Sequence, residues 1–532
     1  MWRRPAHTEI RVRRAPPPGR MPAVSSLCGL AANPALSAAD LDRLVALADE
    51  TVADVLLGRP DLGRTRALAL AHRVEGVART LASTGRLAAD DIDPAVWPDA
   101  ALALLDRGEG PAAWARRFAA DPDRERRERL AACPGLPSDV IETLAADPEP
   151  EVVVELAFSG DAETTARLAS HPHASVRNAV AVNEATPPAV LAALLTGEGL
   201  PPVRHCRVCD QEEIPFVHGR DCARPDCVLP PGDACDGTHA STVHGIRVAA
   251  LGNPATPAEA AARFAGHSDP MARWALAGRP DLPAAACAVL AGDPLPGIRA
   301  DLAANPAVDA TLARAMAADP AAEVRRALAH HPRLPLDVLT ALARTTRLGS
   351  ALLPRVAGAS PAETEALACS PDPAVRTLVA RRRDLPPATR DRLADDPDAK
   401  VVAAVAPHPG LTEARLRGMI ARHGAQVLAG VAANPDAPPA LLEELARREP
   451  PVRKVLREVA RHPSATPAAL LACLADDRAR RSAAGHPALP PSALAELTTH
   501  QDWRVREAAA AHPALPQAVT ADLLRSGDVV SR

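Results

Sequence analysis

Two short apolar stripes, separated by prolines, alternate along most of the chain in a unit of about 26 residues. In the clearest copy, residues 319–343, Val324 and Leu328 lie four positions apart and so share one face of a helix. Asp319 precedes this helix as an N-cap, and Pro335 begins a second helical stretch after a short bend. The pattern therefore predicts two short helices per unit, joined at proline corners.

A dipeptide that ends in proline closes the first helix of most units, because a residue before proline is pushed out of the helical region. Asn and His exchange freely at the position before proline. This exchange fits a side chain that hydrogen-bonds to a neighbouring backbone group, and it does not fit catalysis. The corners are Asn33-Pro34, Arg59-Pro60, Cys133-Pro134, Asn253-Pro254, Arg279-Pro280, Asn305-Pro306, His331-Pro332, His408-Pro409, Asn434-Pro435, His462-Pro463, His486-Pro487 and His512-Pro513, with Arg383-Asp384 assigned to the same register.

Neither helix of a unit can bury its apolar stripe alone, so neighbouring units must stack on one another. The apolar residues are chiefly Ala, Leu and Val, since Tyr is absent and only five Trp and four Phe occur in 532 residues. Small side chains of this kind suit closely spaced helices better than one large core. We therefore expect an all-α solenoid of about fifteen stacked units, although residues 86–128 fit the pattern poorly.

One cysteine-rich segment interrupts the repeats, and it holds five of the ten cysteines. The predicted organisation is a disordered basic extension at 1–20, N-terminal helical repeats at 21–198, the insert at 199–244, C-terminal helical repeats at 245–523 and a tail at 524–532. The remaining cysteines, Cys28, Cys133, Cys287, Cys369 and Cys473, are isolated in helical segments and are interpreted as small core residues. Clustering of this kind indicates a metal site in a reducing compartment and not a disulfide framework.

The repeat resembles that of the leucine-rich repeat variant family, whose unit reads approximately LAxDPxxxVRxxLAxNPxxPxxxLxxL. The match is close at residues 293–343, 372–397 and 462–517. The resemblance implies a right-handed superhelix of alternating α and 3₁₀ helices. It also implies an iron–sulfur alternative for the insert, because iron–sulfur cysteines are associated with that family.

The insert carries the spacing Cys-x2-Cys-x12-Cys-x4-Cys-x7-Cys-x3-His, from Cys206 to His239. A segment this small cannot fold on apolar burial alone, and a metal ion would stabilise it. Zinc prefers four ligands in a tetrahedron, and a Cys-x2-Cys knuckle supplies two of them from one tight turn. The most economical ligand set is Cys206, Cys209, Cys222 and Cys227, and Cys235 and His239 are further candidates.

Residues 235–239, CDGTH, resemble the terminal signature of the CDGSH iron–sulfur family. In that family the equivalents of Cys235 and His239 bind the cluster. The two upstream cysteines there are separated by one residue, whereas Cys222 and Cys227 are separated by four. Zinc is therefore the leading cofactor, and an iron–sulfur cluster is the alternative.

A recurring arginine lies in register along the units and has two possible roles. The set is Arg177, Arg247, Arg299, Arg325, Arg376, Arg453 and Arg506. A ladder of arginines can bind a phosphate polymer, but capping acids recur in register as well: Asp269, Asp293, Asp319, Asp372 and Asp396. Ion pairing between units is therefore the expected role.

Charge and motifs restrict the function further. The formal net charge of −4 gives no general attraction to nucleic acid or anionic membranes, and no run of 18 apolar residues exists to form a transmembrane helix. Basic stretches at 378–392 and 447–461 leave nucleic-acid binding as a weaker alternative, with few aromatic residues to stack bases. No catalytic motif is present. We predict a cytoplasmic, non-enzymatic scaffold that binds a protein partner, and the alternative is an iron–sulfur redox or sensor protein.

Overall fold

The computed structural model describes residues 21–210, 218–219, 232, 235 and 237–530, and within them the fold is helical without a strand. The chain divides into two compact units. Unit 1 comprises residues 82–348, and unit 2 combines residues 21–81 with residues 349–530. The predicted all-α solenoid is confirmed, whereas the predicted extension at 1–20 lies outside the described residues.

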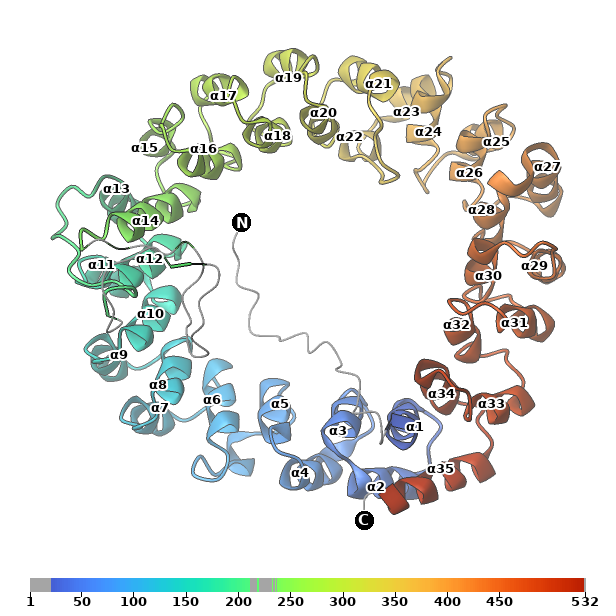
Figure 1. Cartoon of the computed structure of the whole chain (residues 1–532), viewed down its shortest axis with the longest axis horizontal. Helices are drawn as coiled ribbons and strands as arrows, with labels where there is room; N and C mark the ends of the chain where they lie inside the picture. The colour runs from blue at the N-terminus through green and yellow to red at the C-terminus, as the bar shows by residue number, and fades with distance from the viewer. Residues whose placement is uncertain (1–20, 211–217, 220–231, 233–234, 236, 531–532) are drawn as a thin grey trace. The chain divides into compact units, whose positions relative to one another are not determined.

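In unit 1 the helices form two rows, and each repeat contributes one helix to each row (Figure 1). The inner row is α6 (Pro98–Asp106), α8 (Arg124–Ala131), α10 (Pro150–Ser159), α12 (Ala174–Val182), α14 (Ala240–Gly252), α16 (Pro270–Ala277), α18 (Pro296–Ala303) and α20 (Ala322–Leu328). The outer row is α7 (Ala112–Ala119), α9 (Ser138–Ala145), α11 (Ala162–Leu168), α13 (Pro188–Thr196), α15 (Ala258–Ala262), α17 (Ala284–Ala291), α19 (Ala310–Met316) and α21 (Leu336–Thr345).

Unit 2 has the same two rows, built from both ends of the chain. The first row is α22 (Pro354–Ala357), α24 (Pro373–Val379), α26 (Ala399–Val405), α28 (Leu428–Ala432), α30 (Arg453–Val459), α32 (Arg480–Ala484), α34 (Trp503–Ala510), α1 (Met21–Ala32) and α3 (Glu50–Leu57). The second row is α23 (Pro361–Ala368), α25 (Pro387–Ala394), α27 (Glu413–His423), α29 (Pro439–Ala446), α31 (Pro467–Cys473), α33 (Pro491–Leu497), α35 (Gln517–Val530), α2 (Ala38–Leu47) and α4 (Gly63–Arg73). Helix α5 (Val77–Ser83) and the 3₁₀ turns η1 (Ala89–Asp91) and η2 (Gly424–Gln426) complete the described elements.

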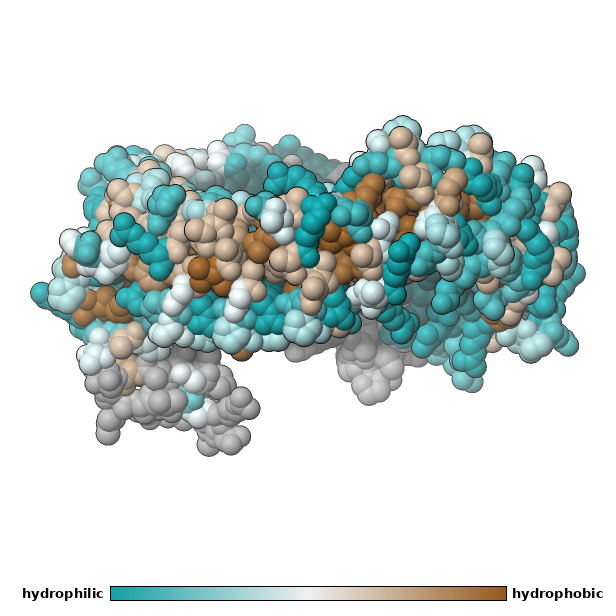
Figure 2. Space-filling view, turned by 90° about the horizontal axis from the view of Figure 1, so that it is seen from above, coloured by the Kyte–Doolittle hydropathy of each residue, from teal (hydrophilic) through white to brown (hydrophobic). Residues whose placement is uncertain are grey.

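The core runs between the two rows, as the apolar stripes predict. Val324 and Leu328 of α20 are fully buried, and Leu339 and Leu342 of α21 have at most 1% of their surface exposed. The second helix of each described repeat is an α-helix, where the family resemblance allows 3₁₀ turns. Apolar residues form a band between hydrophilic margins on the face in Figure 2, and no helix of the described residues is long and apolar enough to cross a membrane.

In several repeats the corner residue before proline bonds to the backbone of the previous repeat. Asn434 donates from Nδ2 to the carbonyl oxygens of Ala406 and His408, at 2.6 and 2.7 Å, and its Oδ1 accepts from the amide of Asp436. His462 performs the same two tasks: its Nε2 lies 2.7 Å from the Asn434 carbonyl oxygen, and its Nδ1 accepts from the amide of Ser464. The predicted reason for the exchange of Asn and His is thereby confirmed.

The corner predicted at Arg383-Asp384 begins one residue earlier in the structure, at Arg382. Arg382, and not Arg383, reaches back to the carbonyl oxygens of Val356 and Ala359, at 3.1 and 2.9 Å. Its guanidinium also forms a bidentate pair with Asp384. The corner is therefore Arg382-Arg383, and the error arose because this copy lacks the proline that marks the others.

Two of the seven recurring arginines, Arg299 and Arg376, form close ion pairs between repeats, as predicted. Arg299 binds the carboxylate of Asp319 in the next repeat through Nε and Nη2, at 2.7 and 3.0 Å, and its Nη1 donates to the carbonyl oxygen of Asp293. The same arrangement joins Arg376 to Asp396. Other arginines of the set donate to backbone oxygens instead, as Arg177 does to His171 and Pro201. Arg453 lies 4.0 Å from the carboxylate of Asp476, and its side chain is 86% exposed.

Replacing Arg299 by Ala is expected to cost about 2–3 kcal/mol of unfolding free energy, because it leaves the buried Asp319 carboxylate without its counterion. The two side chains are only 13% and 8% exposed. Urea denaturation measures the effect. The matched control is Arg314→Ala, whose pair with Asp337 is 51% and 66% exposed and should contribute less than about 1 kcal/mol. Equal losses in the two variants would contradict this assignment.

A buried corner histidine should make stability depend on pH. His408 is 1% exposed, and burial, reinforced by the charge of Arg383, lowers its pKa from 6.5 to about 4. The folded state therefore binds a proton less readily than the unfolded chain. The contribution of neutral His408 is complete above pH 6.5 and is lost as the pH falls from 6.5 to about 4.

We expect His408→Asn to remove up to about 3 kcal/mol of the stability loss across this pH window. Nε2 of His408 bonds to the carbonyl oxygen of Ala380, and the side chain of Asn can make this bond without titrating, as that of Asn434 does at its own corner. Urea denaturation at several pH values between 8 and 4 measures the slope. An unchanged slope in the variant would show that other groups determine the acid sensitivity.

The first and last repeats of unit 2 stack through the same contacts as repeats that follow one another in sequence. Asn33 donates from Nδ2 to the carbonyl oxygens of Ala510 and His512, at 3.2 and 2.8 Å. Asn434 makes the equivalent bonds one repeat back along the chain. Leu30 of α1 is fully buried. Helix α1 therefore occupies the place that the next repeat would take after α34.

The close fit of α1 on α34 depends on a glycine. A Cβ atom built on Gly29 would overlap the carbonyl oxygen of Glu507 and lie 2.6 Å from Cβ of Ala510. Gly430 is equally placed within the chain, where a Cβ atom would lie 3.0 Å from the Ala403 oxygen and 3.0 Å from Cβ of Ala406. The two joints thus have the same register.

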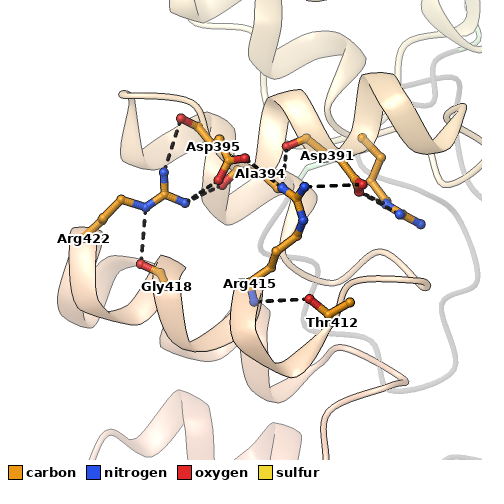
Figure 3. A network of polar contacts seen from close by, with 8 residues as sticks. Asp391, Ala394, Asp395, Thr412, Arg415, Gly418 and Arg422 are labelled. Carbon is orange, nitrogen blue, oxygen red and sulfur yellow. Dashed lines mark hydrogen bonds and ion pairs between the residues drawn. The ribbon is translucent and has the colours of Figure 1, made fainter.

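The second row of unit 2 is held together in addition by ion pairs. Figure 3 shows Arg415 and Arg422 of α27 reaching across to the carboxylates and carbonyl groups at the end of α25. Arg415 Nη1 lies 2.7 Å from Oδ2 of Asp395, and Arg422 Nη2 lies 2.9 Å from its Oδ1. One acid of α25 therefore neutralises two cations of the next repeat.

Candidate metal centre

The start of the insert is fixed to the repeats by backbone hydrogen bonds. The amides of Arg204 and His205 donate to the carbonyl oxygen of Pro172, and the amide of Ala174 donates to the carbonyl oxygen of His205 at 2.9 Å. These bonds form an isolated bridge between His173 and His205. The first cysteine knuckle, residues 206–209, therefore begins at a defined position beside the corner between α11 and α12.

His173 anchors the other end of this knuckle. Its Nδ1 accepts from the amide of Ser175 at the start of α12, so Nε2 carries the proton and donates to Oδ2 of Asp210 at 2.7 Å. The amide of Asp210 in turn donates to the carbonyl oxygen of Cys206. His173 is buried, and this chain of contacts fixes the turn that presents the two thiols.

The second pair of ligand candidates lies on a tight turn at the start of α14. His239 has φ of 58°, and among the described residues it is the one non-glycine residue with a positive φ. A left-handed residue of this kind costs free energy and persists where the surrounding structure requires it. Gly237, with φ of 87°, allows the turn to bring the side chain of His239 back onto Cys235.

Four side chains converge between these two turns. The Sγ atoms of Cys206, Cys209 and Cys235 and a ring nitrogen of His239 all lie within 4.8 Å of one another. Nδ1 of His239 is 3.7 Å from Sγ of Cys209 and 3.6 Å from Sγ of Cys235. A tetrahedral zinc site with Zn–S of about 2.3 Å and Zn–N of about 2.05 Å would place these atoms about 3.6 Å apart.

The sulfur atoms of Cys209 and Cys235 are closer together than two thiolates bound to one metal ion would be. Sγ of Cys209 lies 3.0 Å from Sγ of Cys235, where two thiolates on one zinc ion would be about 3.8 Å apart. The four ligand atoms lie close enough together to bind a single ion, and the Cys3His donor set is one that zinc prefers.

The surroundings of Cys209 and Cys235 shift the pKa values of their thiols in opposite directions. Burial and the hydrogen bond with Cys235 raise the pKa of Cys209 to about 12. Burial also opposes ionisation of Cys235, but the hydrogen bond from the Cys209 thiol and the amide of Gly237 outweigh it and lower its pKa. Cys206 and Cys235 are almost completely buried. A cation at this position would be shielded from water by the protein.

Four of the six ligand candidates named from the sequence lie together in the structure. Cys206, Cys209, Cys235 and His239 come together, which makes a Cys3His cluster compatible with a metal such as zinc. Cys222 and Cys227 lie outside the described residues. The four described residues by themselves supply a complete tetrahedral set.

Two supporting residues, His173 and Asp210, were missed from sequence. The signal was a departure from the repeat: His173 caps α12 at the position where other inner helices have Asp, such as Asp269 and Asp372. Among the isolated cysteines, the core interpretation holds for Cys28, Cys133, Cys287 and Cys473, which are buried, but it is wrong for the exposed Cys369. Cys369 ends α23, where its side chain leaves the core.

Comparisons with known proteins identify no family for the chain. No family model matches it, and no curated protein matches it. Among solved structures it aligns with an engineered protein crystallised by the Northeast Structural Genomics Consortium, at 14% identity over 94% of both chains and a TM-score of 0.15. A TM-score this low supports no argument about fold. The chain is therefore described by its own architecture, a helical repeat protein with a Cys3His cluster.

Proposed function

We propose that the protein is a non-enzymatic scaffold that binds a protein partner, and that its insert is folded around one structural zinc ion. The observation that carries the proposal is the convergence of three thiols and one imidazole within 4.8 Å. Stacked repeats give the molecule a large surface without a central core, and extended surfaces of this kind are used for binding.

Several features favour a structural role for the metal. Four protein ligands fill a zinc tetrahedron and leave no open position for water or substrate. The ligands come from two turns that are separated by 25 residues of the insert, from Cys209 to Cys235. An ion that joins these turns would hold the two ends of the insert together against the repeats. The protein would accordingly act in a reducing compartment such as the cytoplasm, where thiols stay available.

An iron–sulfur cluster is the second candidate, because both Cys235 and His239 of the CDGTH segment lie in the cluster. The compact donor set favours one ion, since all four ligand atoms are within 4.8 Å of one another. Zinc has no redox chemistry, so the two candidates imply different functions.

Purification under anaerobic conditions, followed by elemental analysis and absorption spectroscopy, separates the two candidates. We expect a colourless protein with about one zinc per chain. A brown protein that contains iron and inorganic sulfide would replace the structural role by a redox or sensor role. A protein without any metal would overturn both.

A further inference from the structure

A hollow of about 520 Å³ lies between helices α24 and α26 in the first row of unit 2. Its lining includes three cationic side chains, Arg381, Arg383 and Lys400, and the hydroxyl-bearing Ser350 and Thr377. Among the residues that the structure describes, no acidic residue lines it. The hollow is thus a concave surface of one charge sign in a chain that is close to neutral overall.

These three cations differ from four neighbouring arginines between residues 376 and 392, each of which forms an ion pair with a carboxylate. Arg376 pairs with Asp396, Arg382 with Asp384, Arg390 with Asp391 and Arg392 with Glu365. In the part of the chain that the structure describes, no carboxylate lies in ion-pair distance of the three lining cations. Arg381 donates to the carbonyl oxygen of Ala351 at 3.3 Å, and Arg383 donates to that of Pro407.

Two acidic residues close to these cations in sequence, Asp384 and Asp398, already have other partners. The carboxylate of Asp398 accepts from the amide of Lys400 as the cap of α26, and Asp384 is held by Arg382. Burial lowers the pKa of the Arg381 guanidinium, which means that its charge has lost water without gaining a counterion. An anion in the hollow would restore the missing interaction.

We propose that this hollow binds a small molecule that carries two or more phosphate groups. Arginine presents a planar fork of donors that matches phosphate oxygens, and lysine adds a compact charge. The volume lies in the range of small-molecule pockets, about 300–1,000 Å³, and exceeds what one phosphate group needs. Leu352, which is 41% exposed, gives an apolar margin, and no aromatic residue of the lining could stack a nucleic-acid base.

This site is independent of the metal centre and of the protein-scaffold proposal. The cysteine cluster lies in unit 1, and the hollow lies in unit 2. The ion pair of Arg376 in α24 with Asp396, which lies just before α26, fixes the two helices that border the hollow to one another. A preformed cationic hollow loses little free energy to reorganisation on binding.

Calorimetric titration of the full chain with inorganic tripolyphosphate tests the proposal. We expect saturable binding of one ligand per chain, and we expect Lys400→Gln and Arg383→Gln each to weaken it about tenfold or more. Both side chains are exposed, so the fold should survive, and thermal melting of each variant verifies this.

The matched control is Lys454→Gln, because Lys454 is the only other lysine in the sequence and is exposed on α30. This variant should bind tripolyphosphate as the wild type does. Absence of saturable binding would overturn the proposal, and so would an equal loss in the control, which would indicate diffuse charge attraction. A single-stranded oligonucleotide that binds where tripolyphosphate does not would also overturn it, in favour of a polymer-binding surface.

Discussion

Replacement of Cys235 by Ser is expected to abolish metal binding under competition with a chelator. Apparent binding energies of structural zinc sites are about 10–16 kcal/mol, so loss of one of four ligands should cost about 3 kcal/mol, or more than about 100-fold in affinity. Cys235 is 5% exposed and contacts both Cys209 and His239. Elemental analysis after dialysis against the chelator measures the loss.

The control for this experiment is Cys287→Ser. Cys287 is 1% exposed in α17 and lies in the repeats, so its replacement places a polar group in the core without touching the cluster. It should lower the melting temperature and leave the metal content unchanged. Retention of metal by the Cys235 variant would show that the fourth ligand comes from elsewhere in the insert, and Cys222→Ser and Cys227→Ser would then identify it.

Replacement of Gly29 by Ala should detach α1 from α34. The new methyl group would overlap the backbone carbonyl of Glu507 and lie 2.6 Å from Cβ of Ala510. Backbone atoms cannot yield as a flexible side chain can, so we expect a cost of about 3 kcal/mol or more at this joint. Hydrogen exchange followed by mass spectrometry should show faster exchange in α1 and α34, with the remainder of unit 2 unchanged.

Gly418→Ala is the matched control for the joint. Gly418 also lies inside a helix of unit 2, α27, and a Cβ atom there would meet nothing within 4 Å. Because Ala favours helix over Gly, this variant should be neutral or more stable by up to about 1 kcal/mol. Unchanged protection of α1 in the Gly29 variant would contradict the assignment of this contact as a tight repeat joint.

The repeat architecture could be predicted because its information is local. Spacing alone placed Val324 and Leu328 on one buried face. The exchange of Asn and His before proline indicated that these side chains bind backbone groups, and the hydrogen bonds of Asn434 and His462 confirm it. The pairing of α1 with α34 could not be predicted. Asn33 has the sequence of an ordinary corner, and nothing in it specifies that its carbonyl partners are Ala510 and His512.

The metal centre shows a similar division between local and distant information. The knuckle of Cys206 and Cys209 was evident, because both thiols lie on one turn. Which residues complete the site depends on how the insert folds back, and five cysteines with a histidine allow several closures. The left-handed backbone of His239 and the anchoring of Asp210 by His173 select Cys235 and His239 among the described residues.

X-ray absorption at the zinc edge tests the central claim most directly, because it counts the atoms bound to the metal in the intact protein. Coordination by Cys206, Cys209, Cys235 and His239 predicts three sulfur atoms at about 2.3 Å and one nitrogen atom at about 2.05 Å. Four sulfur atoms, a shell of oxygen and nitrogen only, or a second metal atom at short distance would contradict it.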